Sequence, residues 1–167
     1  TLAAKWNPNS IPIYYQQYSL YRRTLNIIGR ADLINERKAL YIKTLSILKI
    51  IEEINPLTGI VSEGRGHLLV ENSDIRVDGW EKQAINEFKN ALKLNPILFR
   101  ARLALARLLV QQGDLNEAVP LMNDGVNYFY SSALPGLGEF YQYAVKLNQM
   151  NGDTIKAREI EGRYDGY

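Results

Sequence analysis

Apolar residues recur along most of the chain with the period of an α-helix. Between residues 78 and 95 they form one stripe at 3.6 residues per turn, made of Ala84, Ile85, Phe88, Ala91 and Leu92. Asp78 with Glu81 predicts a capping box at the start of this helix, and Pro96 predicts its end. A second apolar stripe begins near Phe99 and stops at Gly113, a residue type that closes a helix without steric cost. Because the connections are short, the pattern predicts helices that run antiparallel to their neighbours.

The same periodicity predicts helices elsewhere in the chain. We expect them over residues 11–28 after a cap at Ser10, over 32–54 after a cap at Asp32, and over 56–72, 115–128, 137–150 and 153–163. The helix over 56–72 is the least regular, because Gly59, Gly64 and Gly66 each lower helix propensity by about 1 kcal/mol relative to alanine. The pattern therefore predicts an all-helical chain, because no segment has the two-residue period of a strand.

Internal repeats mark where the helical pairs end. An Asn-Pro dipeptide stands at residues 7–8, 55–56 and 95–96, so the prolines are 48 and 40 residues apart. Gly113 and Gly152 are separated by 39 residues and mark a second repeated turn. We interpret the first residues as the end of an incomplete repeat, because Ala3-Ala-Lys-Trp-Asn-Pro8 is similar to Ala91-Leu-Lys-Leu-Asn-Pro96.

The spacing of these residues resembles the tetratricopeptide repeat. Ala84, Phe88, Ala91 and Pro96 are similar to its second helix and terminal proline, and Leu105, Ala106, Leu109, Gly113 and Ala118 to its first helix and turn. Ala84 and Ala118 are 34 residues apart, which is the period of that repeat. The chain departs from the pattern where Arg102 replaces the usual tryptophan and Ala106 the usual glycine. The resemblance implies an all-α solenoid of antiparallel hairpins stacked in a right-handed superhelix.

On this basis we expect one solenoid domain. Its predicted parts are the end of a preceding repeat (1–9), four hairpins (10–56, 57–96, 97–130 and 131–163, the last after an irregular connection) and a frayed tail (164–167).

Composition narrows the classes of function. Of 167 residues 46% are hydrophobic and 23% charged, which is ordinary for a folded protein, and the net charge of +2 gives no reason to expect nucleic-acid binding. The chain has no cysteine and only one histidine, His67, so we expect neither a metal site nor a cofactor. No serine lies in a nucleophile motif, and no apolar run is long enough for a membrane span. We therefore predict a segment without catalytic residues of its own.

The resemblance also implies a binding surface. In a solenoid the first helix of each hairpin has one face in the core and another toward a concave groove. The predicted groove residues are Tyr15, Arg22, Arg23, Arg100, Leu103, Arg107, Gln111, Gln142 and Lys146. With Glu139 on the same predicted stripe, basic groups outnumber acidic ones five to one. Such a lining favours an acidic peptide of a protein partner, or an anionic glycan, although the same residues also fit an ordinary solvated helix surface.

Two further interpretations stay open. The sequences of residues 95–130 and 141–157 resemble the tetratricopeptide tails of bacterial O-antigen polymerases and ligases, which would make this segment a periplasmic part that positions a glycan or a partner. Without that link the compartment is undetermined, and the cytoplasm fits equally. Self-association is the other interpretation, because a solenoid whose first repeat is incomplete exposes an apolar hairpin.

Overall fold

The computed structural model describes residues 11–28, 33–72, 75, 78–128 and 134–164, and all its regular elements in these ranges are α-helices. The chain divides into two compact units, residues 1–94 and 95–167, which we describe separately. Several predictions concern residues outside the described ranges: the incomplete first repeat (1–9), the caps at Ser10 and Asp32, part of the irregular connection (129–133) and most of the tail (165–167). They stay predictions.

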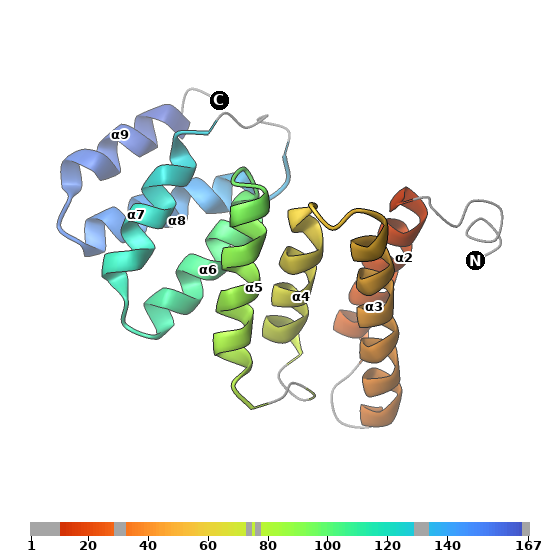
Figure 1. The fold of residues 1–167 in the computed structure, drawn as a ribbon. Coiled ribbons are helices and arrows are strands. Elements are labelled where there is room, and N and C mark those ends of the chain that lie inside the picture. The colour runs from red at the N-terminus through yellow and green to blue at the C-terminus, as the bar shows by residue number, and fades with distance from the viewer. Residues whose placement is uncertain (1–10, 29–32, 73–74, 76–77, 129–133, 165–167) are drawn as a thin grey trace. The chain divides into compact units, whose positions relative to one another are not determined.

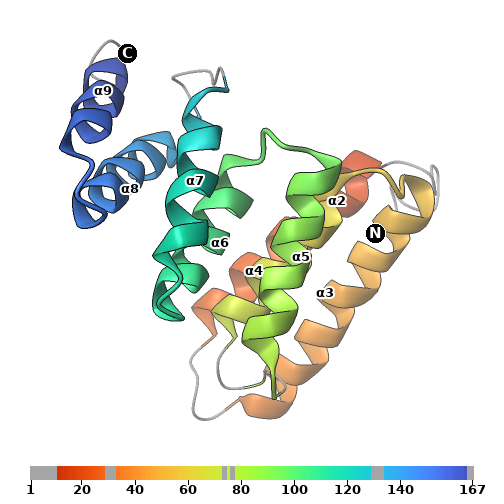
Figure 2. The ribbon, with the colours of Figure 1, turned by 60° about the vertical axis from the view of Figure 1, so that its left-hand side comes forward.

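The described residues of unit 1 form four helices. They are α2 (Ile11–Ile27), α3 (Ile34–Ile54), α4 (Gly59–Glu71) and α5 (Trp80–Leu94), and each lies within a few residues of its predicted position. Helix α2 packs on α3, α3 on α4, and α4 on α5, and Figures 1 and 2 show α4 and α5 lying side by side. The chain thus forms two antiparallel helical pairs within this unit.

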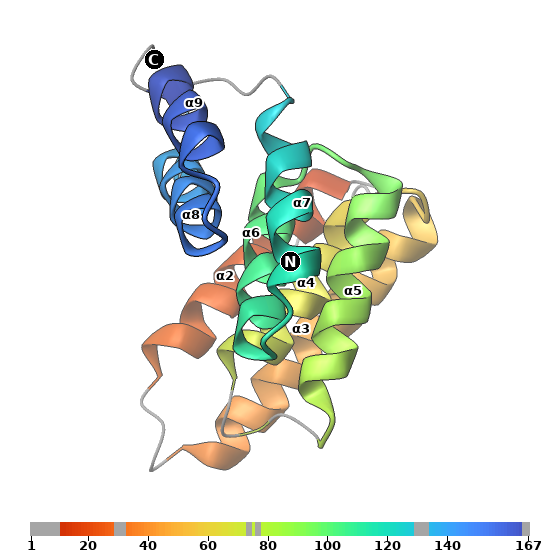
Figure 3. The same cartoon turned by 90° about the vertical axis from the view of Figure 1, so that its left-hand side faces the viewer.

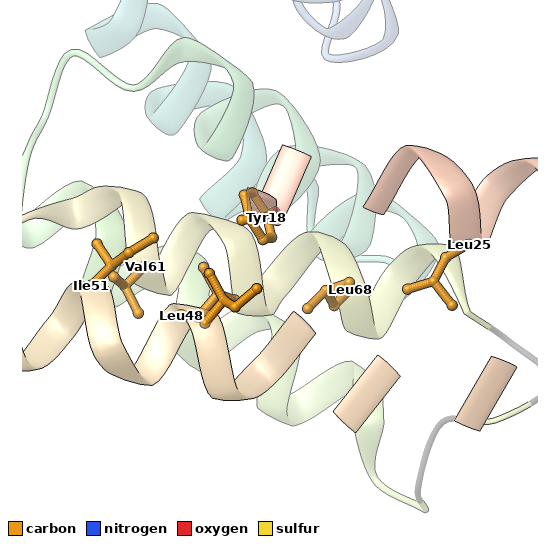
Figure 4. Close-up of a cluster of buried hydrophobic side chains, with 7 residues drawn as sticks. Tyr18, Leu25, Leu48, Ile51, Val61 and Leu68 are labelled. Carbon is orange, nitrogen blue, oxygen red and sulfur yellow. The ribbon is translucent and has the colours of Figure 1, made fainter. Parts of the chain in front are cut away.

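The core of unit 1 joins its first three helices. Tyr18 and Leu25 of α2, Ile47, Leu48 and Ile51 of α3, and Val61 and Leu68 of α4 form one buried cluster (Figure 4). Tyr14 and Tyr21 are partly buried and pack against it. Full burial of an aliphatic side chain contributes about 1.5–3 kcal/mol, so this cluster is a main source of stability in the unit.

The glycines of α4 have a packing role that explains their place in a helix. A Cβ atom on Gly66 would lie 2.6 Å from the ring of buried Phe88, and one on Gly64 would lie 3.0 Å from Leu48 and from the Tyr18 hydroxyl. Helices α2 and α5 therefore approach the backbone of α4 closely on two sides. Thr58 caps this helix by accepting a hydrogen bond from the amide of Ile60 at 3.4 Å.

One predicted cap is wrong. Helix α5 begins at Trp80, and the carbonyl of Gly79 accepts the first hydrogen bond of the helix, from the amide of Gln83 at 3.2 Å. Gly79 has a φ of 72°, a left-handed conformation in which glycine avoids the strain of a side chain. Gly79 therefore holds the position directly before the helix in place of Asp78.

In unit 2, too, the residues that the structure describes form four helices. They are α6 (Phe99–Gln111), α7 (Leu115–Val126), α8 (Leu137–Met150) and α9 (Thr154–Tyr164). Helix α6 packs on α7, α8 on α9, and α8 also contacts both α6 and α7 (Figure 3). The small residues Ala106 of α6 and Ala118 of α7 are completely buried.

The two turns of unit 2 have the same geometry. Gly113 and Gly152 adopt left-handed φ values of 81° and 80°. The residue after each glycine then donates its backbone amide to a carbonyl of the preceding helix: Asp114 to that of Leu109 at 2.8 Å, and Asp153 to that of Asn148 at 2.9 Å. Both aspartates then cap the following helix through a side-chain oxygen, at 3.0 Å from the amide of Glu117 and 2.9 Å from that of Lys156. The 39-residue sequence repeat thus corresponds to a structural repeat.

Candidate functional site

The predicted groove residues of α6 differ in their access to solvent. Arg100, Arg107 and Gln111 are exposed on one side of the helix. Leu103 is only 6% exposed, so its prediction as a groove residue is wrong, and its side chain belongs to the core. Helical periodicity placed it one turn from both arginines, but neighbouring segments cover that position in the folded unit.

Contacts between α6 and α8 bring the predicted stripes of these two helices together. The Arg107 guanidinium donates to Glu139 with an Nη2 to Oε1 distance of 2.5 Å, and its Cζ lies 5.4 Å from the centre of the Tyr143 ring. Gln142 and Lys146 are exposed on α8, three and seven residues after Glu139, and therefore lie on the same side of the helix. We call the resulting face the α6–α8 surface, and its residues are Arg100, Arg107, Gln111, Glu139, Gln142, Tyr143 and Lys146.

Arg100 lies at the edge of the α6–α8 surface near the start of α8. Its Nη2 donates to the carbonyl of Pro135 at 2.9 Å, and its Cζ lies 5.8 Å from the centre of the Phe99 ring. Within the part of the chain that the structure describes, these contacts leave the positive charge without a carboxylate partner, because a carbonyl carries no formal charge. The α6–α8 surface thus carries three cations and one carboxylate.

Tyr143 contributes a partly covered aromatic ring to this face. Burial raises the pKa of its phenol, and the neighbouring Arg107 charge opposes that rise. The phenol therefore stays neutral near pH 7 and can donate a hydrogen bond. An arginine stacked on an aromatic ring is held in a limited set of orientations, which lowers the entropy lost when it binds a carboxylate.

The predicted groove residues of unit 1 lie in a different electrostatic environment. Arg22 of α2 forms a bidentate ion pair with Glu71 of α4, in which the Nε to Oε2 distance is 2.9 Å. Asn26 donates to the same carboxylate at 3.4 Å, and Nδ1 of His67 lies 3.8 Å from it. The charge of Arg22 is therefore matched by that of Glu71.

The ion pair also shifts the titration of its neighbours. Burial alone would raise the pKa of Glu71, but the hydrogen bonds and charge of Arg22 outweigh burial and hold that pKa below its usual 4.5. Burial raises the pKa of the Tyr18 phenol to about 12, and its hydroxyl lies 3.5 Å from the Gly64 carbonyl. Tyr15 and Arg23 are exposed on α2, Tyr15 by 39%.

Sequence reasoning missed two residues at these surfaces. Tyr143 follows Gln142 directly and lies four residues before the buried Leu147, so helical periodicity alone gives it an ambiguous position. Glu71 lies at the end of a glycine-rich helix that contributed no residue to the predicted groove. A prediction that included the first helix of the second hairpin would have placed Glu71 beside α2.

Among the described residues, no group of three or more histidine, cysteine, aspartate or glutamate side chains could hold a metal ion. Within the same ranges, no helix has the length and apolar character that crossing a membrane requires.

Comparisons with known proteins identify the fold. The family model of the tetratricopeptide repeat matches residues 81–133, which include α5, α6 and α7. A thermophilic TPR protein from Thermus thermophilus has a similar structure, with a TM-score of 0.58 and 22% identity over 86% of this chain and 66% of that one. Two crystal structures of MamA superpose with TM-scores of 0.56 and 0.58 at 15% and 16% identity, over 96% and 99% of this chain and 74% and 86% of theirs. No curated protein sequence matches the chain.

Residues 81–133 are thus tetratricopeptide repeat sequence, and the chain has the tetratricopeptide repeat fold. Proteins of this class are scaffolds that bind other proteins on the extended surfaces of their stacked helices. This agrees with the resemblance inferred from the spacing of Ala84, Phe88, Ala91 and Pro96.

Proposed function

We propose that the chain is a binding module and that its α6–α8 surface recognises an acidic segment of a protein partner. The observation that carries this proposal is the surplus of positive charge on this face, where Arg107 is stacked on Tyr143 and paired with Glu139, the one carboxylate of the α6–α8 surface. Arg100 and Lys146 add two further cations to the same face. Carboxylates of a partner would form charge-assisted hydrogen bonds with these groups, each contributing about 1.5–3 kcal/mol.

The neutral side chains of the α6–α8 surface support a peptide as the ligand. Gln111 and Gln142 are exposed there, and each amide can both donate and accept a hydrogen bond. An extended peptide presents backbone amides and carbonyls along its whole length, so glutamines can bind it between the positions of its acidic side chains. Charge alone would also attract other anions, which is why the experiment includes a charged glycan.

The test measures binding of a fluorescein-labelled peptide of alternating glutamate and serine by fluorescence anisotropy. Replacement of both Arg100 and Arg107 by glutamate should weaken binding at least roughly tenfold, because a loss of about 1.4 kcal/mol already has that effect. The matched control is Lys82→Glu with Arg158→Glu, which changes the net charge equally at exposed positions on α5 and α9.

The outcomes separate the ligand classes. If the control pair weakens binding as much as the Arg100 and Arg107 pair, the attraction is a property of net charge and the proposed surface is wrong. If an oligogalacturonate competes for the surface far better than the acidic peptide does, the ligand is an anionic glycan.

A further inference from the structure

The charges of the α6–α8 surface stand in a fixed order, because α6 and α8 run in the same direction. Arg100, near the start of α6, donates to the carbonyl of Pro135, just before α8. Arg107, seven residues later on α6, contacts Glu139 and Tyr143 of α8. Residues further along one helix thus contact residues further along the other. A segment that lies along this face therefore meets the charges of both helices one after another.

The ion pair between Arg107 and Glu139 lies in the middle of this order and presents its carboxylate to solvent. The guanidinium of Arg107 rests on the ring of Tyr143, and this side chain is 44% exposed, against 59% for Glu139. Glu139 lies in the first turn of α8, where the positive end of the helix dipole favours a carboxylate. A carboxylate can accept about four hydrogen bonds, and Arg107 donates one of them, to Oε1. The centre of the surface can therefore accept hydrogen bonds from a cation of the ligand.

Cations stand at both ends of this order. Arg100 lies seven residues before Arg107 on α6, and Lys146 lies seven residues after Glu139 on α8. At the rise of an α-helix each separation is about 10 Å, which an extended peptide spans with about three residues. The one carboxylate of the α6–α8 surface is paired with Arg107, so neither end has a carboxylate of this surface beside it. The surface therefore presents a positive, a negative and a positive site in that order, about three peptide residues apart.

We propose that Glu139 is the specificity-determining residue of this surface, and that the acidic segment of the partner carries one basic residue between two acidic ones. The inference rests on the proposed function, because the two acidic residues are the groups that bind Arg100 and Lys146. The basic residue binds the exposed carboxylate of Glu139, which repels an acidic residue at the same place. A polyanion of uniform charge, such as an anionic glycan, cannot supply this central cation.

The test compares two fluorescein-labelled peptides that have the same composition, the same net charge and blocked termini. One has the order Glu-Ser-Ser-Lys-Ser-Ser-Glu and the other the order Lys-Ser-Ser-Glu-Ser-Ser-Glu, so only the order of the charges differs. The charges of the first peptide are symmetric, so it fits the surface in either direction. Fluorescence anisotropy measures binding to the full chain at low ionic strength, because salt screens exposed charges.

We expect the native chain to bind the first peptide roughly fivefold more tightly than the second, which is the size of effect that ion pairs at exposed positions produce. Glu139→Gln should reduce this preference to less than about twofold, because the central site then lacks its carboxylate. The matched control is Glu161→Gln, at an exposed position of α9. It changes the net charge equally and should leave the preference unchanged.

Equal binding of the two peptides by the native chain would overturn the inference. A preference that survives Glu139→Gln, or that disappears in Glu161→Gln, would overturn it as well. In each of these cases the proposed function still stands if both peptides lose binding when Arg100 and Arg107 are replaced by glutamate. If that double replacement leaves the binding of both peptides unchanged, the proposed function is wrong and the inference falls with it.

Discussion

Arg102 shows how one departure from the repeat pattern is accommodated. Its side chain is buried, yet its guanidinium donates to the carbonyls of Leu121 and Pro96 at 2.7 and 2.9 Å and to Asp124 at 2.8 Å. These contacts join the start of α6 to the end of α7. Pro96 lies in the turn between α5 and α6, outside both helices, so the buried arginine supplies a donor to a carbonyl that would otherwise be costly to bury.

We predict that Arg102→Ala lowers the free energy of unfolding by about 3 kcal/mol, because it leaves two carbonyls without their donor and opens a cavity. The matched variant is Asp124→Asn, which removes the ionic part of the contact but keeps an oxygen acceptor. Because the Asp124 side chain is 60% exposed, this variant should cost less than about 1 kcal/mol. Urea unfolding followed by circular dichroism measures both, and equal losses would show that the ion pair dominates.

Glu71 gives unit 1 a predictable response to acid. Because its pKa in the folded state lies below the usual 4.5, its ion pair with Arg22 stabilises the fold fully above about pH 5, and this contribution is lost as the pH falls through the folded-state pKa. We therefore predict that the difference in unfolding free energy between the native chain and Glu71→Gln shrinks as the pH is lowered from 6 to 3.

The control for this series is Glu87→Gln, because burial raises the pKa of Glu87 above its usual value. Its carboxyl group therefore favours the folded state at low pH and loses that contribution as the pH rises. The native chain should thus gain stability relative to Glu87→Gln as the pH falls, the opposite trend to Glu71→Gln. Parallel trends for the two variants would contradict the assignment of opposite pKa shifts.

At the scale of the element, α4 shows how packing overrides helix propensity. Its glycines predict a weak helix, yet a 13-residue helix forms because neighbouring helices approach its backbone where side chains are absent. The cost in propensity, about 1 kcal/mol for each glycine, is offset by the burial of Phe88, Tyr18 and Leu48 against this helix. Propensity measured along the chain cannot include these contacts, because they involve residues distant in the sequence.

We predict opposite effects of adding a methyl group at two helical glycines. Gly66→Ala should destabilise unit 1 by about 1–2 kcal/mol, because overpacking against the ring of Phe88 outweighs the gain in helix propensity. Gly162→Ala in α9 should stabilise by about 0.5–1 kcal/mol, because no atom lies within 4 Å of the new Cβ atom. Thermal unfolding distinguishes them, and a stabilised Gly66→Ala variant would contradict the close contact.

At the scale of the whole molecule, the periodicity of apolar residues predicted the helices and their order. The stripes of Ala84, Phe88 and Ala91 in α5 and of Leu105 and Leu109 in α6 are buried as predicted, because the period of 3.6 residues fixes which side of a helix is apolar. The caps at Asp114 and Asp153 and the turns at Gly113 and Gly152 also follow from local chemistry. These features depend on neighbours a few residues away, so the sequence shows them directly.

The candidate sites depended on contacts between distant residues. The α6–α8 surface was predicted in part, since Arg107 lies 32 residues before Glu139 and only folding brings them into contact. The prediction was wrong for Leu103, and it left out Glu71, which neutralises Arg22 from a distance of 49 residues in sequence. Exposure and charge balance are set by what packs against each helix. The sequence by itself thus determined the helices, their turns and the repeat family, whereas the tertiary structure alone decided which charged residues are paired and which side chains are buried, because ion pairs and burial form only between folded elements.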